Sequence, residues 1–94
     1  MGLTFEWDSV KASQNKAKHG VTFEEASTVF LDTLGGIVDD PRHSVGEHRL
    51  VLMGMSDRSR LLAVMFTQRG GSIHLISARR LTRAERMTYE ETRR

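Results

Sequence analysis

SIHLISARRLTRAERMTYE, residues 72–90, is the stretch that decides the fold. Its first nine residues alternate in character, which predicts a strand that ends in two arginines. Thr82 and Glu85 have the spacing of a capping box, so a helix is predicted from residue 83 to about residue 92. The unit carries an arginine pair, a histidine, a carboxylate and a phenol, a set suited to handling phosphate. Regular alternation predicts one face with Ile73, Leu75, Ser77 and Arg79, and the other with His74, Ile76, Ala78 and Arg80.

Upstream of this unit, the sequence predicts two more capped helices and four more strands. Leu3, Phe5 and Trp7 alternate with polar residues and predict a first strand. One helix follows from residue 9 to Gly20, after the N-cap Asp8, and another over 22–31, where Thr22 and Glu25 form a second capping box. Further strands are predicted over the ranges 37–38, 47–55 and 60–68.

The segments between the predicted elements indicate how these are joined. Residues 39–46 form a polar connection that holds the only proline, whereas short turns separate the last strands. The 60–68 strand is apolar on both faces, which predicts a central place in the sheet. The order β-α-α-β-β-β-β-α therefore predicts an α+β domain, a small twisted antiparallel sheet with flanking helices.

Length and composition bound the class of protein. Ninety-four residues form one domain, spanning residues 1–94, and a content of 38% hydrophobic and 28% charged residues is typical of a globular chain. The chain has no cysteine, which excludes disulfides and thiolate chemistry. No apolar run approaches the roughly 18 residues of a membrane span, and the N-terminus lacks a signal-peptide pattern, so a cytoplasmic protein is expected.

Charge is distributed unevenly along the chain. Residues 1–57 hold five basic and nine acidic side chains, whereas residues 58–94 hold nine arginines and three glutamates. The guanidinium of arginine binds phosphate oxygens in a two-point geometry. A nucleic acid or an acidic protein is therefore a more natural partner than a neutral small molecule, unless the basic residues only form a solvated face.

The candidate chemistry rests on scattered polar residues, because no familiar nucleotide-binding, metalloprotease or hydrolase motif is present. Neither a metal ion nor a cofactor is expected. RNA carries its own nucleophile, the 2′-OH, so its cleavage needs only a proton acceptor, a proton donor and cations beside the phosphate. Candidate cations are Arg69, Arg79 and Arg80. Candidates for proton transfer are His19, Glu47, His48, His74, Glu85 and Tyr89.

Several short motifs occur in an order that resembles a known family. They are FEWD (residues 5–8), KHG (18–20), TFEEA (22–26), GEHR (46–49), ISARR (76–80) and ERMTY (85–89). Together with Lys11, Asn15, Asp32 and Gly54, they resemble the BrnT family of bacterial type II toxin–antitoxin systems, across residues 5–90. The chain departs from the family pattern at His74 and Gln68, where many relatives carry arginine and glutamate.

This resemblance implies a RelE-like fold and a metal-independent endoribonuclease toxin that inhibits translation. It also implies a BrnA-like ribbon-helix-helix antitoxin that neutralises the toxin, with operator DNA reached only through their complex. By position, the resemblance puts Arg69 and Arg79 at the head of the catalytic residues, whereas Glu47, Lys18, His19 and Tyr89 fall on other recurring family positions. Glu47, Tyr89 and His19 are added as catalytic candidates. Binding of RNA or antitoxin is assigned to Lys18, His74, Arg80 and Arg83.

Two other functions are compatible with the sequence. A non-catalytic basic module would bind the antitoxin and act only as co-repressor of its operon. A DNA-binding domain is the weaker hypothesis, because the basic stretch lacks helix-turn-helix spacing. Cleavage of RNA in the presence of a chelator separates the ribonuclease from both.

Overall fold

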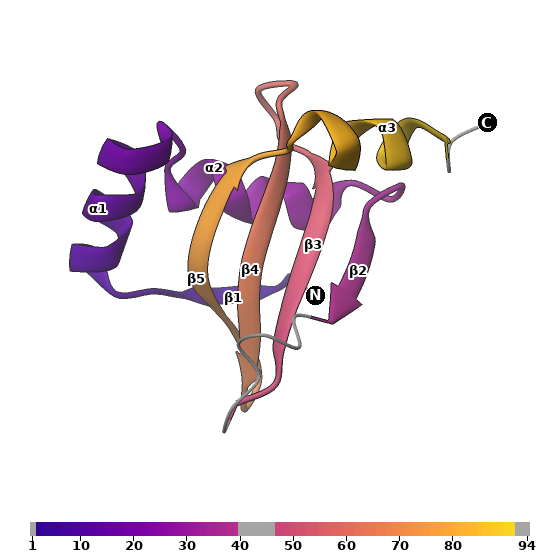
Figure 1. Ribbon diagram of the computed structural model, residues 1–94. Coiled ribbons are helices and arrows are strands. Elements are labelled where there is room, and N and C mark those ends of the chain that lie inside the picture. Colours follow the sequence, from indigo (N-terminus) through magenta and orange to yellow (C-terminus); the bar gives the residue numbers. More distant parts are fainter. Residues whose placement is uncertain (1, 40–46, 92–94) are drawn as a thin grey trace.

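The structure is a computed structural model of the chain, and it describes residues 2–39 and 47–91. Its three helices and one five-stranded sheet confirm an α+β domain (Figure 1). Most of the polar connection predicted for residues 39–46 lies outside the described residues. In chain order the elements are β1 (Thr4–Glu6), α1 (Ser9–His19), α2 (Phe23–Thr28), the 3-10 turn η1 (Val29–Leu31), β2 (Gly36–Asp39), β3 (Arg49–Met55), β4 (Leu61–Arg69), β5 (Ser72–Arg80) and α3 (Arg83–Glu91).

The sheet is mixed, so the prediction of an antiparallel sheet is wrong for one strand. The strand order is β1-β5-β4-β3-β2, and β1 pairs with β5 in parallel while all other pairs are antiparallel. The Phe5 ring lies 5.1 Å from that of Phe30, which lies 5.0 Å from that of Phe66. This aromatic contact holds the three-residue β1 at the sheet. As predicted, β4 is central.

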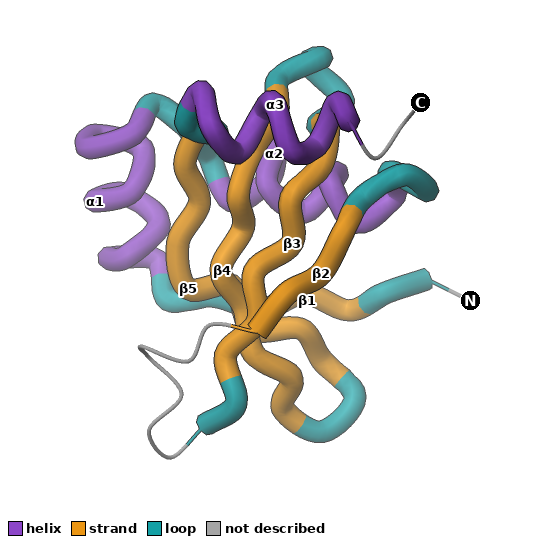
Figure 2. The backbone as a smooth tube through the Cα atoms, turned by 45° about the vertical axis from the view of Figure 1, so that its right-hand side comes forward, coloured by secondary structure: helices purple, strands orange, loops and turns teal. Residues whose placement is uncertain are grey.

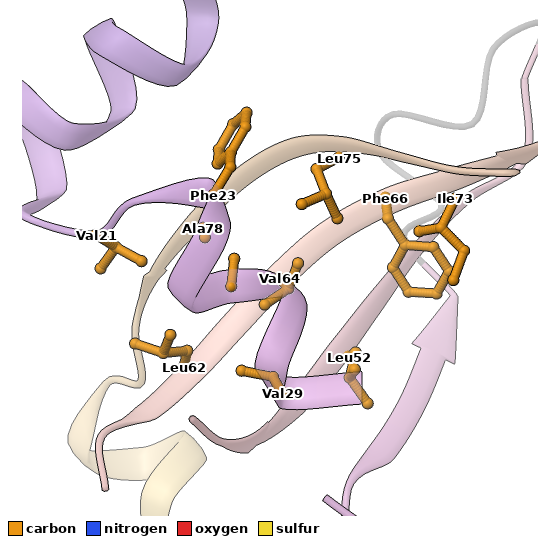
Figure 3. Close-up of a cluster of buried hydrophobic side chains, with 11 residues drawn as sticks. Val21, Phe23, Val29, Leu52, Leu62, Val64, Phe66, Ile73, Leu75 and Ala78 are labelled. Carbon is orange, nitrogen blue, oxygen red and sulfur yellow. The ribbon is translucent and has the colours of Figure 1, made fainter. Parts of the chain in front are cut away.

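Helices lie on both sides of the sheet. In Figure 2, α2 lies behind the strands and α3 crosses in front of one end. We call the side under α2 and η1 the inner face and the opposite side the outer face. Figure 3 shows Phe23 and Val29 pointing from the helical segment onto the inner face, where the core forms. The strand residues of this core are Leu52, Leu62, Val64, Phe66, Ile73, Leu75 and Ala78.

A β-bulge in β5 changes which side chains share a face. Phe66 is paired with Leu75, but the preceding Met65 is paired with Ser77, so Ile76 has no partner in the register. The alternation predicted from the sequence is therefore wrong beyond residue 75. Leu75 and Ala78 are both buried on the inner face, whereas His74, Ser77 and Arg79 lie together on the outer face.

The helix caps follow the sequence, with one exception. Asp8 accepts a hydrogen bond from the N–H of Val10 (2.9 Å) at the start of α1. At α3, Thr82 and Glu85 bond each other's backbone N–H groups, which confirms the capping box. At α2, Thr22 accepts from the N–H of Glu25, but the Glu25 carboxylate binds Arg60 and Ser56 instead of returning to Thr22. The second capping box is therefore only half formed.

Candidate active site on the outer face

A row of polar residues crosses the outer face at one end of the sheet. The strand register places Arg49 beside Thr67, Thr67 beside His74, and His74 beside Glu6. Neighbouring strands are about 4.8 Å apart, so these side chains are immediate neighbours across four strands. Thr67 is buried and donates its hydroxyl to the His48 carbonyl oxygen (2.8 Å), which fixes the chain just before β3.

An ion pair lies beside this row. The Arg69 guanidinium donates to both carboxylate oxygens of Glu47, with Nε and Nη2 distances of 2.7 and 2.9 Å. Arg69 lowers the pKa of Glu47, and His74 and Arg49 act more weakly in the same direction. Both side chains are nearly half exposed, so water competes for the pair and a phosphate can displace it.

His74 is less exposed than Glu6, Glu47 and Arg69. Its side chain is 15% exposed, and Nδ1 lies 3.4 Å from a carboxylate oxygen of Glu6. Within residues 2–39 and 47–91, Nε2 of His74 has no hydrogen-bond partner, so it is available to a ligand. We define the outer-face cluster as Glu6, Glu47, Arg49, Arg69 and His74.

Two predicted catalytic residues lie at the other end of the sheet. Arg79 is five residues beyond His74 in β5, about 16 Å along the strand. It donates to both carboxylate oxygens of Glu85 on α3 (2.7 and 3.0 Å). These bonds, partly opposed by desolvation, lower the pKa of Glu85 to about 2. Tyr89 donates its hydroxyl to Asp32 (2.9 Å). The first contact joins α3 to β5 and the second joins α3 to the end of η1. The predicted catalytic roles of Arg79 and Tyr89 stay predictions.

The remaining predicted residues are distributed over the surface. Lys18 and His19 line a shallow depression between α1 and β5. Arg80 and Arg83 are exposed and form no ion pair within the described part of the chain. His48 lies near the outer-face cluster but pairs with Asp39 through Nε2 (2.9 Å) in an exposed contact.

Sequence reasoning did not select Glu6 and Arg49 for the site. Glu6 alternates with Phe5 and Trp7, a signal that it lies on the polar side of its strand. The pairing of β1 with β5 joins strands far apart in the sequence, and no local pattern predicts it. For Arg49 the sequence offered only its spacing: it lies two residues after Glu47 and hence on the same side of an extended chain.

Among the described residues, no three or more histidine, aspartate or glutamate side chains are grouped to hold a metal ion. Nor does that part of the chain contain a helix with the length and hydrophobicity needed to cross a membrane.

The fold is similar to that of a solved toxin. The crystal structure of the Brucella abortus ribonuclease toxin, BrnT, superimposes with a TM-score of 0.66 and 22% sequence identity, covering 87% of this chain and 100% of that chain. At this identity the likeness concerns the fold. No match was found among curated proteins.

The sequence itself carries the family relationship. Residues 7–85 match the family described as "Ribonuclease toxin, BrnT, of type II toxin-antitoxin system". The chain therefore belongs to the BrnT family of ribonuclease toxins, which confirms the resemblance seen in its motifs. A toxin of a type II system implies an antitoxin partner. The matched range includes four cluster residues, all except Glu6, and it ends before Tyr89.

Proposed function

We propose that this chain is a metal-independent endoribonuclease toxin whose reaction centre is the outer-face cluster. The observation that carries the proposal is the two-point Glu47–Arg69 pair beside His74 on a single sheet face. The cluster combines a carboxylate, an imidazole and guanidinium groups. These are the three kinds of group that cleavage by the 2′-OH requires.

The proposed reaction begins when an RNA phosphate binds Arg69 and releases Glu47 from its ion pair. Glu47 accepts the 2′-OH proton while the 2′ oxygen attacks phosphorus. The bond from phosphorus to the 5′ oxygen then breaks, and protonated His74 donates a proton from Nε2 to that leaving oxygen. The products are a 2′,3′-cyclic phosphate and a 5′-hydroxyl. Arg69 and Arg49 offset the charge that develops on the phosphate oxygens.

The other predicted residues have supporting roles in this proposal. Lys18 and His19 bind the RNA strand outside the reaction centre. Arg79 and Tyr89 position α3 through their contacts with Glu85 and Asp32. Arg80 and Arg83, exposed at the same end of the sheet, are available to RNA or antitoxin.

Family membership supports the wider biological proposal. We propose a RelE-like toxin, acting as a single cytoplasmic domain, that inhibits translation by cutting RNA. A BrnA-like ribbon-helix-helix antitoxin neutralises it and brings it to operator DNA. Co-expression of that antitoxin should restore growth and incorporation of labelled amino acids to cells that produce the toxin.

Cleavage of RNA by the purified protein in excess EDTA tests the reaction centre. We expect wild type to cleave and to leave 2′,3′-cyclic phosphate ends. Glu47→Gln and His74→Gln should each lower the rate by about 10²- to 10⁴-fold. Arg86→Ala is the matched control, because Arg86 is exposed on α3 outside the cluster.

Two results would contradict the proposal. Loss of cleavage on chelation would exclude a metal-independent reaction. Absence of cleavage by a folded wild type that still binds its antitoxin would favour the non-catalytic co-repressor instead.

A further inference from the structure

A second polar region lies beside the outer face, between α1 and the edge of β5. It is a shallow depression of about 320 Å³. The lining is basic and polar, with Ile76 at the bulge as its only apolar residue. It consists of Lys11, Gln14, Asn15, Lys18, His19, Ile76 and Ser77.

The depression has a fixed shape because Asn15 fastens α1 to the sheet. Its side-chain amide donates to the carbonyl oxygens of Val21 (3.0 Å) and Ala78 (2.8 Å), and its oxygen accepts from the N–H of Ala78 (3.0 Å). β1 pairs only with residues 72–74 of β5, and the Asn15 side chain bonds the backbone of β5 further along, at Ala78. The lysines on the same helical stripe are held beside Ser77 as a result.

The basic side chains of the depression have no acidic partner in the part of the chain that the structure describes. No carboxylate lines it, and within the described residues Lys11, Lys18 and His19 form no ion pair. The arginines of the sheet differ, because Arg69 and Arg79 are each held by a glutamate through two hydrogen bonds. A polyanion therefore finds uncompensated positive charge at this depression.

We propose that the depression binds a backbone phosphate of single-stranded RNA, next to the nucleotide cleaved at the outer-face cluster. The inference rests on the proposed ribonuclease function. Ser77 lies on the outer face three residues after His74, about 10 Å along β5. An RNA strand following β5 thus passes from the cluster to the depression. There the two lysines bind a phosphate, and the Gln14 amide and Ser77 hydroxyl offer hydrogen bonds.

The test uses a fully 2′-O-methylated oligonucleotide, which lacks the attacking hydroxyl, so binding is measured without cleavage. Fluorescence anisotropy compares wild type, Lys11→Gln/Lys18→Gln and the matched control Lys16→Gln. Lys16 lies on the same helix and is exposed, but it does not line the depression. Glutamine has a helix propensity close to that of lysine, so α1 is preserved in all variants.

The double variant should bind on the order of 10- to 100-fold more weakly at 50 mM salt. The slope of log K against log salt should become shallower by roughly 0.7, the value for one lost phosphate contact on a single strand. Lys16→Gln should keep the wild-type affinity and slope. A dinucleotide is too short to reach from the cluster to the depression, so the double variant should bind it as wild type does.

Equal affinity and salt slope in wild type and the double variant would overturn the phosphate site. So would loss of antitoxin binding with unchanged oligonucleotide binding, which would assign the lysines to the antitoxin. Failure of the two proposals is distinguishable. A wild type that binds the oligonucleotide through the lysines but cleaves no RNA retains the phosphate site and refutes the reaction centre.

Discussion

Replacing Asn15 should lower the stability of this small domain by more than is usual for a residue on a mostly polar helix. Asn15 is only 6% exposed, and Asn15→Ala removes all three of its hydrogen bonds to Val21 and Ala78. At about 1 kcal/mol for each bond, the expected loss is about 3 kcal/mol. A domain of this length has a total stability of roughly 5–14 kcal/mol. The melting temperature should therefore fall by about 12–24 °C.

The measurement is urea denaturation followed by circular dichroism and by the fluorescence of Trp7, whose ring packs against Phe23. Gln14→Ala is the control, because Gln14 is the exposed neighbour on α1 and its loss should change stability by less than about 0.5 kcal/mol. Asn15→Asp should be at least as harmful as Asn15→Ala at pH 7, since a carboxylate oxygen would face two carbonyls. A loss below about 1 kcal/mol in Asn15→Ala would refute the view that this amide fastens α1 to β5.

Two further predictions concern charge and packing. Glu85→Gln should lower stability at pH 7 by up to about 3 kcal/mol, because the pKa of Glu85 is depressed to about 2 in the folded protein. A depressed carboxyl pKa stabilises above the unfolded value, so this difference from wild type should shrink as pH falls from about 4.5 to about 2; an equal difference in denaturation at pH 7 and pH 2.5 would contradict it. Gly54→Ala should cost about 1–3 kcal/mol, because a Cβ there would lie 3.0 Å from both the Asp32 carboxylate and Val29. Gly36→Ala, with open space around its Cβ, should lie within about 0.5 kcal/mol of wild type, and equal losses in the two variants would refute the packing argument.

The number of basic residues in the second half of the chain does not show where unpaired positive charge lies on the folded protein. Its nine arginines predicted a phosphate-binding region. In the fold, Arg60, Arg69 and Arg79 are each engaged by a glutamate. Glu25 and Glu47, which hold the first two, come from the acidic first half. Within residues 2–39 and 47–91, the lysines of α1 form no ion pair, although the first half has a net negative charge.

The sequence by itself determined the features that depend on residues close together in the chain, namely helix caps, helix ends and strand patterns. Asp8 and Thr82 begin their helices as predicted, because a capping side chain reaches backbone N–H groups within one turn. Gly20 ends α1 with a positive φ of 70°, which glycine adopts without steric cost. The strand over residues 72–80 and the central place of the apolar 60–68 segment also followed from local pattern. The motifs, read in order, gave the family.

Only the tertiary structure decided which side chains meet across the sheet. The bulge at Ile76 moves Ser77 and Arg79 to the face of His74, and a break of one residue reverses every later side chain. The parallel pairing of β1 brings Glu6 to His74, and Asn15 bonds Ala78 from a helix that reads as a surface element. These contacts join residues more than 60 positions apart. Their partners are selected by how the whole chain packs, a property that local periodicity and capping do not encode.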